Sequence, residues 1–186
     1  MLRLVLQTEE SGSVLGALAY LSQFFTILTN AAVCLLLGAV ALGAPVAPRV
    51  TQAFTIAIVG VGVVYHVALA HLRELSGLEL LGDHGVHTVV PLLTFLWWLF
   101  WAPKSPLRAT YALVWIAWPV LYCIYILIRA AGSGFYPYPF LNLPELGVVG
   151  LAQSIAVLCA AFVVIGLALT GMSRLVARRT VVRATK

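Results

Sequence analysis

Residues 147–172 read GVVGLAQSIAVLCAAFVVIGLALTGM and contain no charged side chain. A stretch of about 20 apolar residues is long enough to cross the hydrocarbon core of a bilayer as an α-helix. The rest of the chain has the same character, because 62% of its 186 residues are hydrophobic and only 9% are charged. A water-soluble domain of this length has no core large enough to bury so much apolar surface, so the sequence predicts an integral membrane protein.

Four further apolar stretches predict additional membrane-spanning helices. The five predicted spans cover residues 14–42, 50–72, 86–101, 107–128 and 147–172. The third is the shortest, because the charged and His-rich flank at 83–87 has to lie at or just below the membrane surface. We therefore expect an all-α, polytopic transmembrane helical bundle. Residues 1–186 form a single integral membrane domain, with a basic tail at 173–186.

The distribution of charge predicts the orientation of the chain. Five of its eleven Lys and Arg residues lie in the last thirteen positions, and an excess of basic residues marks the cytoplasmic side of membrane proteins. With this tail in the cytoplasm and five spans, eight of the eleven basic residues lie inside and all six acidic residues lie outside. We expect a multi-pass protein of the cell membrane with a cytoplasmic C-terminus. This placement of the basic residues does not indicate nucleic-acid binding.

Polar residues inside the predicted spans are few and lie mainly toward the outer side, where they are the first candidates for function. Thr26 and Asn30 are four residues apart and share a helix face, with Thr29 on its flank. His84 and His87 share a face at the head of the third span. At about 1.5 Å per residue, Thr26 lies about 9 Å and His87 about 5 Å below the outer boundary. A threonine hydroxyl and an imidazole can therefore meet.

The second span adds Tyr65 and His66 on the same side of the membrane. Burying three imidazoles separately in lipid costs several kcal/mol more than grouping them with polar partners and water. We therefore expect His66, His84 and His87 to face one shared cavity.

The loop at 129–146 is rich in aromatic residues and proline. The prolines at 137 and 139 exclude a continuing helix. We expect the segment from Tyr136 through Tyr138 to Phe140 to fold over the mouth of the bundle as an aromatic lid.

Four motifs taken together resemble the androgen-induced-protein-like family of membrane proteins, in its bacterial six-span branch. They are FFTILTN (24–30), VGVVYHVALA (61–70), DHGVHTVVPLL (83–93) and SGFYPYPFLN (133–142). The resemblance extends from about residue 17 to 170. Animal members of the family hydrolyse fatty acid esters of hydroxy fatty acids with a threonine nucleophile on an early helix and a histidine on a later one. The resemblance implies Thr26 as nucleophile, His87 as general base, and a lipid substrate that enters from the bilayer.

The chain departs from the family in two places. Bacterial relatives usually begin with one more helix, of which we expect MLRLVLQ (1–7) to be the remainder in a shortened form. Animal members carry Asp or Asn three residues after the threonine, where this chain has Thr29 and then Asn30, so Thr29 is a rival nucleophile. Candidates for substrate binding or for stabilising an oxyanion are Asn30, Tyr65, His66, His84, Tyr136 and Tyr138.

Two other functions remain open at this stage. The same helices and polar groups suit a non-catalytic lipid-binding or scaffolding protein. A membrane haem protein could use His66 and His87 as iron ligands, although the last two spans contain no histidine. We predict no metal and no cofactor, and no pattern indicates an oligomeric state.

The three cysteines lie inside apolar stretches without the spacing of a metal site or of a disulfide framework; they are Cys34, Cys123 and Cys159.

Overall fold

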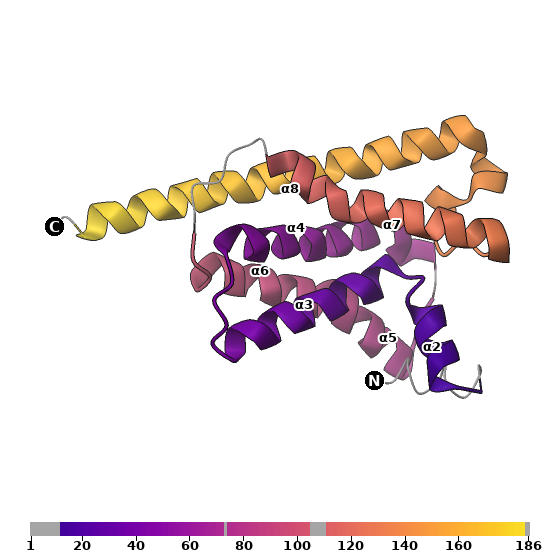
Figure 1. The fold of residues 1–186 in the computed structure, drawn as a ribbon, viewed down its shortest axis with the longest axis horizontal. Helices are drawn as coiled ribbons and strands as arrows, with labels where there is room; N and C mark the ends of the chain where they lie inside the picture. The colour runs from indigo at the N-terminus through magenta and orange to yellow at the C-terminus, as the bar shows by residue number, and fades with distance from the viewer. Residues whose placement is uncertain (1–11, 73, 105–110, 185–186) are drawn as a thin grey trace.

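The computed structural model describes residues 12–72, 74–104 and 111–184, and this part of the chain consists of helices and short connections (Figure 1). The predicted all-α architecture is confirmed. The α-helices are α2 (Val14–Leu21), α3 (Phe25–Ala41), α4 (Pro48–Val64), α5 (Gly77–His84), α6 (Val90–Phe100), α7 (Ala112–Ser133) and α8 (Leu143–Ala184). The shorter helices are the π-helical turns η1 (Tyr65–Leu69) and η3 (Gly85–Val89) and the 3-10 helices η2 (Ala70–Leu72) and η5 (Pro139–Leu141).

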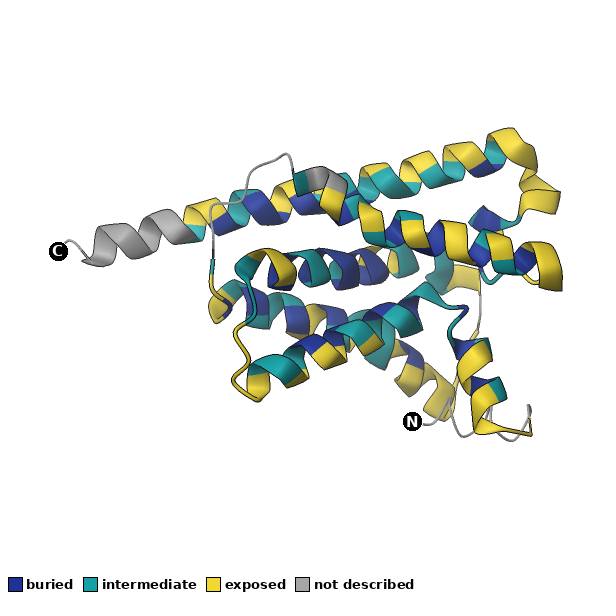
Figure 2. Cartoon of the chain, viewed as in Figure 1, coloured by how far each residue is buried: buried dark blue, intermediate teal, exposed yellow. Residues whose placement is uncertain are grey.

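Helix α4 lies at the centre of the bundle. Helices α3, α6, α7 and α8 all pack against it, and Figure 2 shows its buried residues along most of its length, whereas α2, α5 and the outer faces of α7 and α8 carry many exposed residues. Ile56 of α4 is fully buried in an apolar cluster with Trp98 and Phe162. The approach of α8 to α4 requires glycine, since a Cβ atom at Gly60 would lie 2.5 Å from the Phe162 ring.

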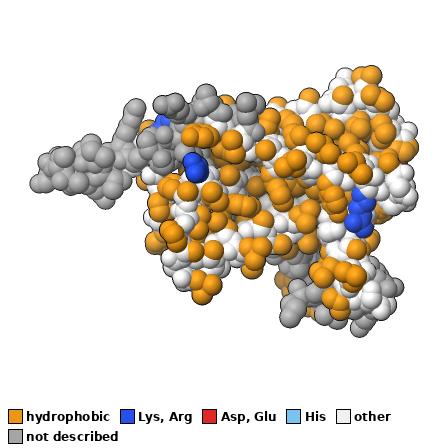
Figure 3. Space-filling model, viewed as in Figure 1, with side chains coloured by type: hydrophobic (Ala, Val, Ile, Leu, Met, Phe, Trp, Pro, Cys, Tyr) orange, Lys and Arg blue, Asp and Glu red, His pale blue; other side chains and the backbone are white. Residues whose placement is uncertain are grey.

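Among the residues that the structure describes, three helical segments are long and apolar enough to cross a membrane. They are Pro48–Leu72, Val114–Ser133 and Leu143–Val176. Helices α2 and α3 pass the same test only as a pair, and they are bent by 103° at the break between them. The long apolar helices and the largely hydrophobic face in Figure 3 indicate a membrane protein. The predicted count of five spans is not confirmed, because these criteria give three, or four if the bent pair is one span.

The third predicted span, 86–101, is divided between η3 and α6. Helix α6 has 11 residues, which at 1.5 Å per residue is roughly 16 Å, well short of the ~30 Å hydrocarbon core. The helix that precedes η3 is α5, and it carries Glu79 and Asp83. The segment is therefore not among those that meet the length and composition of a span. Its apolar part, α6, is short, and the helical turns that precede α6 carry charged residues.

The first predicted span, 14–42, is not one continuous helix. Phe24 adopts an extended conformation (φ −101°, ψ 121°) between α2 and α3. The break is held from α7, where the Tyr122 hydroxyl donates a 2.6 Å hydrogen bond to the Gln23 carbonyl. The Ser22 hydroxyl also lies 3.0 Å from the Tyr125 hydroxyl.

The last two predicted spans differ from the structure mainly at their ends. The predicted start of the fourth, at residue 107, lies outside the described residues, and α7 continues to Ser133. Gly134 caps the C-terminus of α7. Its positive φ of 71° is the left-handed conformation that commonly ends a helix. Helix α8 begins at Leu143 and is kinked at Gly147 (φ 65°, ψ 175°), where the fifth span was predicted to begin.

Candidate active site

Thr26 and His87 meet at one end of the bundle although they are far apart in the sequence. Thr26 lies in the first turn of α3 and is 7% exposed. His87 lies in η3, and its Nε2 atom is 3.1 Å from Thr26 Oγ1, which is hydrogen-bond distance. A threonine in a membrane helix usually bonds a carbonyl of its own helix. A hydroxyl that faces an imidazole from another helix therefore indicates a specific arrangement.

Asp83 determines which nitrogen of the neutral His87 ring carries the hydrogen. His87 Nδ1 lies 3.0 Å from the Asp83 backbone oxygen and 3.3 Å from Asp83 Oδ1. A carbonyl oxygen only accepts hydrogen bonds, so Nδ1 is the protonated nitrogen and donates. Nε2 is then an acceptor, and the Thr26 hydroxyl donates to it. A hydroxyl, an imidazole and a carboxyl group therefore follow one another in the order that hydrolase triads have.

Asp83 lies in the charged flank at 83–87, and the sequence predicted it as a polar candidate at the head of the third span without a specific role. It is one of the buried polar residues, at 4% exposure. Its position four residues before His87 places both side chains on one side of a helical turn. That spacing was the available signal for its role.

Two neighbours hold His87 in place. The Tyr65 ring stacks on the His87 ring, with centroids 3.9 Å apart and an interplanar angle of 14°. Asn30 Nδ2 donates to the backbone oxygen of Thr26 at 2.8 Å and to that of Val86 at 3.2 Å, which connects α3 to η3. Because both amide hydrogens of Asn30 are used in this way, the geometry makes it a positioning residue rather than an oxyanion donor.

Tyr138 brings a phenol to Thr26 from the loop between α7 and α8. It interacts with the Thr26 side chain and with the backbone of Phe25 and Thr26 at the N-terminus of α3. Burial raises the pKa of the Tyr138 phenol, and hydrogen bonding to Thr26 offsets part of that rise. Tyr138 therefore keeps its proton at neutral pH. A protonated phenol and the N-terminus of a helix both stabilise nearby negative charge.

The loop around Tyr138 packs onto the bundle. The Tyr138 ring lies 6.2 Å from that of Tyr122 and stacks on Phe140 at 5.2 Å, and Leu141 is buried beside them. The segment thus lies against the bundle, as predicted for a lid, and does not point away from it. Tyr136 lines neither of the two cavities beside Thr26.

His66 and His84 meet at a different place. His66 Nε2 and His84 Nδ1 lie 3.0 and 3.4 Å from the Thr88 hydroxyl oxygen. Both side chains are exposed, and neither lines the cavity that His87 lines. The prediction of one cavity shared by three histidines is therefore wrong. The π-helical turn η3 changes the angular spacing of residues on which the shared face depended.

Thr29 faces α7 instead of His87. It is fully buried, and its hydroxyl oxygen accepts a 3.0 Å hydrogen bond from Trp118 Nε1. An indole N–H only donates and cannot take a proton from the hydroxyl. Of the two threonines, Thr26 is the one placed beside a base.

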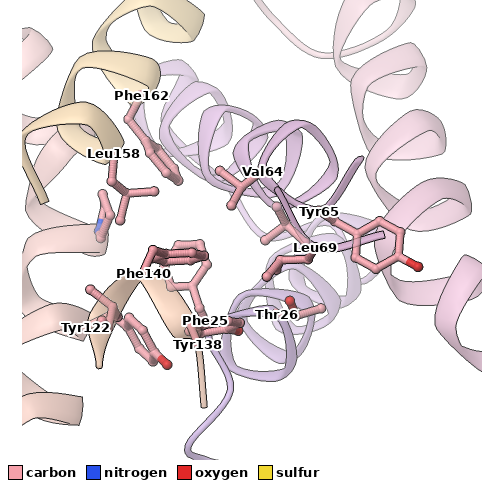
Figure 4. Close-up of a pocket in the computed structure, with 13 residues that line it drawn as sticks. Phe25, Thr26, Val64, Tyr65, Leu69, Tyr122, Tyr138, Phe140, Leu158 and Phe162 are labelled. Carbon is pink, nitrogen blue, oxygen red and sulfur yellow. The ribbon is translucent and has the colours of Figure 1, made fainter. Parts of the chain in front are cut away.

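Two cavities meet at Thr26. The outer groove has a volume of about 870 Å³ and runs between α2, α3, α5 and the loop at 137–139, with His87 and Asp83 in its wall. The inner pocket has a volume of about 30 Å³ and is almost entirely apolar. Figure 4 shows Thr26 and Tyr138 at one side of this pocket and Leu158 and Phe162 at the opposite side. An apolar groove with a few polar groups is typical of a site for a lipid-sized molecule.

The geometry of His87 does not suit haem ligation. Its two ring nitrogens are engaged by Thr26 and Asp83, so neither is available to iron without loss of these contacts. Within the described ranges, no three His, Cys, Asp or Glu side chains are grouped as metal ligands.

Comparisons of the chain with protein-family models, curated proteins and solved structures give no match. The assignment of function therefore depends on the residues of the site.

Proposed function

We propose that this chain is an intramembrane lipid-ester hydrolase that uses Thr26 as nucleophile and His87 as general base. The observation that carries the proposal is the 3.1 Å contact between Thr26 Oγ1 and His87 Nε2, with Asp83 behind the ring. The substrate class, fatty acid esters of hydroxy fatty acids or similar lipids, comes from the family resemblance. The size and apolar lining of the outer groove support a lipid substrate.

In the first step, Thr26 Oγ attacks the ester carbonyl carbon while its proton passes to His87 Nε2. The carbonyl π electrons move to oxygen and give a tetrahedral oxyanion. Asp83 accepts from Nδ1 and stabilises the imidazolium that forms. The oxyanion then collapses, the bond to the alcohol oxygen breaks, and that oxygen takes the proton from Nε2. The products are the free alcohol and an acyl ester on Thr26.

In the second step, water enters the place that the alcohol has left. His87 Nε2 takes a proton from this water as it attacks the acyl carbon, and returns the proton to Thr26 Oγ when the acyl bond breaks. The carboxylic acid leaves and the site is restored. No further reactant is needed.

The tetrahedral oxygen needs hydrogen-bond donors. We assign this role to the Tyr138 hydroxyl and to the backbone N–H groups at the N-terminus of α3, because both meet at Thr26. Donors that already face the developing charge contribute strongly to catalysis in a site with little water.

A second candidate is a lipid-binding protein without turnover, which the size of the outer groove also favours. The two functions differ in what Thr26 does. A binding protein needs only the shape of this residue, whereas a hydrolase needs its hydroxyl.

The test is ester hydrolysis by the purified chain in detergent, with a fatty acid ester of a hydroxy fatty acid as substrate. Thr26→Ala should lower turnover by about 10³-fold or more, Thr26→Ser should keep part of it, and Thr29→Ala should keep most of it as the matched control. Full hydrolysis by Thr26→Ala would contradict the proposal. Lipid binding without hydrolysis by any of these proteins would favour the second candidate.

A further inference from the structure

Two π-helical turns face each other beside the His87 ring. They are η1 (Tyr65–Leu69), at the end of α4, and η3 (Gly85–Val89), which carries His87. The backbone of α4 comes close to η3 because a glycine precedes η1. A Cβ atom at Gly62 would lie 3.2 Å from the His87 carbonyl oxygen. Since π-helical turns occur frequently at functional sites, the contacts between these two turns are candidates for control of the imidazole.

Consecutive residues of η1 contact consecutive residues of η3. The Tyr65 ring stacks on the His87 ring, with centroids 3.9 Å apart. One position further along both turns, His66 Nε2 lies 3.0 Å from the Thr88 hydroxyl oxygen. A hydrogen bond depends steeply on distance and angle. The His66–Thr88 bond therefore holds the two turns in the register in which Tyr65 covers His87.

The same relation is found on the side of α5. Asp83 Oδ1 lies 3.3 Å from His87 Nδ1. The next residue, His84, has its Nδ1 atom 3.4 Å from the Thr88 hydroxyl oxygen, a longer contact than that of His66. A hydroxyl donates one hydrogen bond and accepts two, so Thr88 can contact both imidazoles at once. Each partner of the His87 ring thus has its neighbour in sequence in contact with Thr88.

Resting on the proposed function, we infer that Thr88, His66 and His84 form a positioning cluster that holds the His87 base against Thr26. None of the three cluster residues lines the outer groove or the inner pocket, so the cluster acts on the base and not on the substrate. The sequence predicted the two histidines as binding or oxyanion residues. Their contribution is instead the orientation of His87, where a displacement of about 1 Å can lower the rate by about 100-fold.

The direct test is the effect of Thr88→Val on the full chain in detergent. Valine has nearly the shape of threonine but no hydroxyl, so it removes both histidine contacts. With a fatty acid ester of a hydroxy fatty acid as substrate, kcat should fall by about 10- to 100-fold. KM should stay within about twofold of the wild-type value, because the groove is not altered. Thr88→Ser keeps the hydroxyl and should retain most of kcat.

Two variants of His66 separate the hydrogen bond from the ring. The amide of glutamine donates and accepts hydrogen bonds, so His66→Gln should recover most of the kcat that His66→Ala loses. His71→Ala is the matched control, because His71 is also an exposed histidine and lies shortly after His66, in η2. This variant should keep the wild-type kcat.

A double-mutant cycle distinguishes positioning from a general loss of stability. If the His66–Thr88 bond acts through the ring that stacks on His87, removal of that ring should make the bond unimportant. His66→Ala should then lower kcat by less than about twofold in a Tyr65→Leu background, although it lowers kcat more in wild type. A general loss of stability would lower kcat by the same factor in both backgrounds.

Three outcomes would overturn the inference. Wild-type kcat in Thr88→Val, in a protein whose hydrolysis depends on Thr26, would exclude the positioning cluster and leave the hydrolase proposal standing. An equal loss of kcat for His66→Ala in the two backgrounds would show that His66 does not act through Tyr65. No Thr26-dependent hydrolysis by the wild-type chain would exclude the hydrolase and, with it, this inference.

Discussion

The Nε2 atom of His87 lies 3.1 Å from the Oγ1 atom of Thr26, although 61 residues separate the two in the chain. No local propensity places them together. The contact depends on η3 holding the imidazole against the first turn of α3, and on Asn30 linking the backbones of these two elements. Removal of either link should move the imidazole away from the Thr26 hydroxyl and so lower the proposed hydrolysis.

Asp83→Asn should lower kcat by about 10²-fold with little change in KM, because the ring loses the carboxyl group that stabilises its charged form, whereas the Asp83 backbone oxygen still accepts from Nδ1. Ester hydrolysis at saturating substrate measures this effect. Glu79→Gln is the matched control, since Glu79 lies one turn earlier on α5 and also lines the outer groove. Equal losses in the two variants would mean that only the charge of the groove matters.

Tyr138→Phe should lower kcat by about 10²-fold, the usual effect of losing one oxyanion donor. Tyr136→Phe removes the same atom from a neighbouring residue that lines neither cavity, so it should keep wild-type turnover. The comparison of kcat for the two variants checks the donor role. If Tyr138→Phe retains wild-type kcat, the oxyanion is stabilised elsewhere.

Asn30→Ala should destabilise the protein by about 1–3 kcal/mol, because the Val86 carbonyl loses its partner in a partly buried position. The thermal unfolding curve of the detergent-solubilised variant should shift to lower temperature, and kcat should fall as η3 loosens from α3. An unchanged unfolding curve would show that Asn30 does not join the two elements.

Gly166→Ala should destabilise the packing of α7 against α8. A Cβ atom at Gly166 would overlap the Trp115 ring, which is itself buried. Overpacking of this kind costs about 1–3 kcal/mol. Gly171→Ala is the control on the same helix, since no atom lies within 4 Å of its added Cβ. Thermal unfolding should separate the two variants, and equal curves would contradict the packing argument.

The sequence was sufficient to predict the helical architecture, because long uncharged apolar segments have few alternatives in a membrane. The second predicted span and the helical segment Pro48–Leu72 end at the same residue. The break between α2 and α3 was not predictable in this way. Residues 20–26 contain neither proline nor glycine, and the break is held by Tyr122 and Tyr125 of a distant helix.

The site was predictable in part. The similar depths of Thr26 and His87 predicted that they can meet, whereas the separation of His66 and His84 from them was missed. The missed feature is the π-helical turn η3, since helix faces read from sequence assume α-helical spacing. The inner pocket could not be predicted from the spacing of residues in the sequence. Its wall combines residues of α3 and α8, which only tertiary packing brings together.

The central claim is that the Thr26 hydroxyl is a nucleophile activated by His87, and covalent labelling tests it without any assumption about the substrate. The purified chain is treated with an alkyl fluorophosphonate, and the modified residue is located by mass spectrometry of its peptides. We expect the phosphonate on Thr26 in wild type and in Thr29→Ala, with labelling lost in Thr26→Ala and strongly slowed in His87→Ala. Labelling at another residue, or labelling that is equally fast in His87→Ala, would contradict the account.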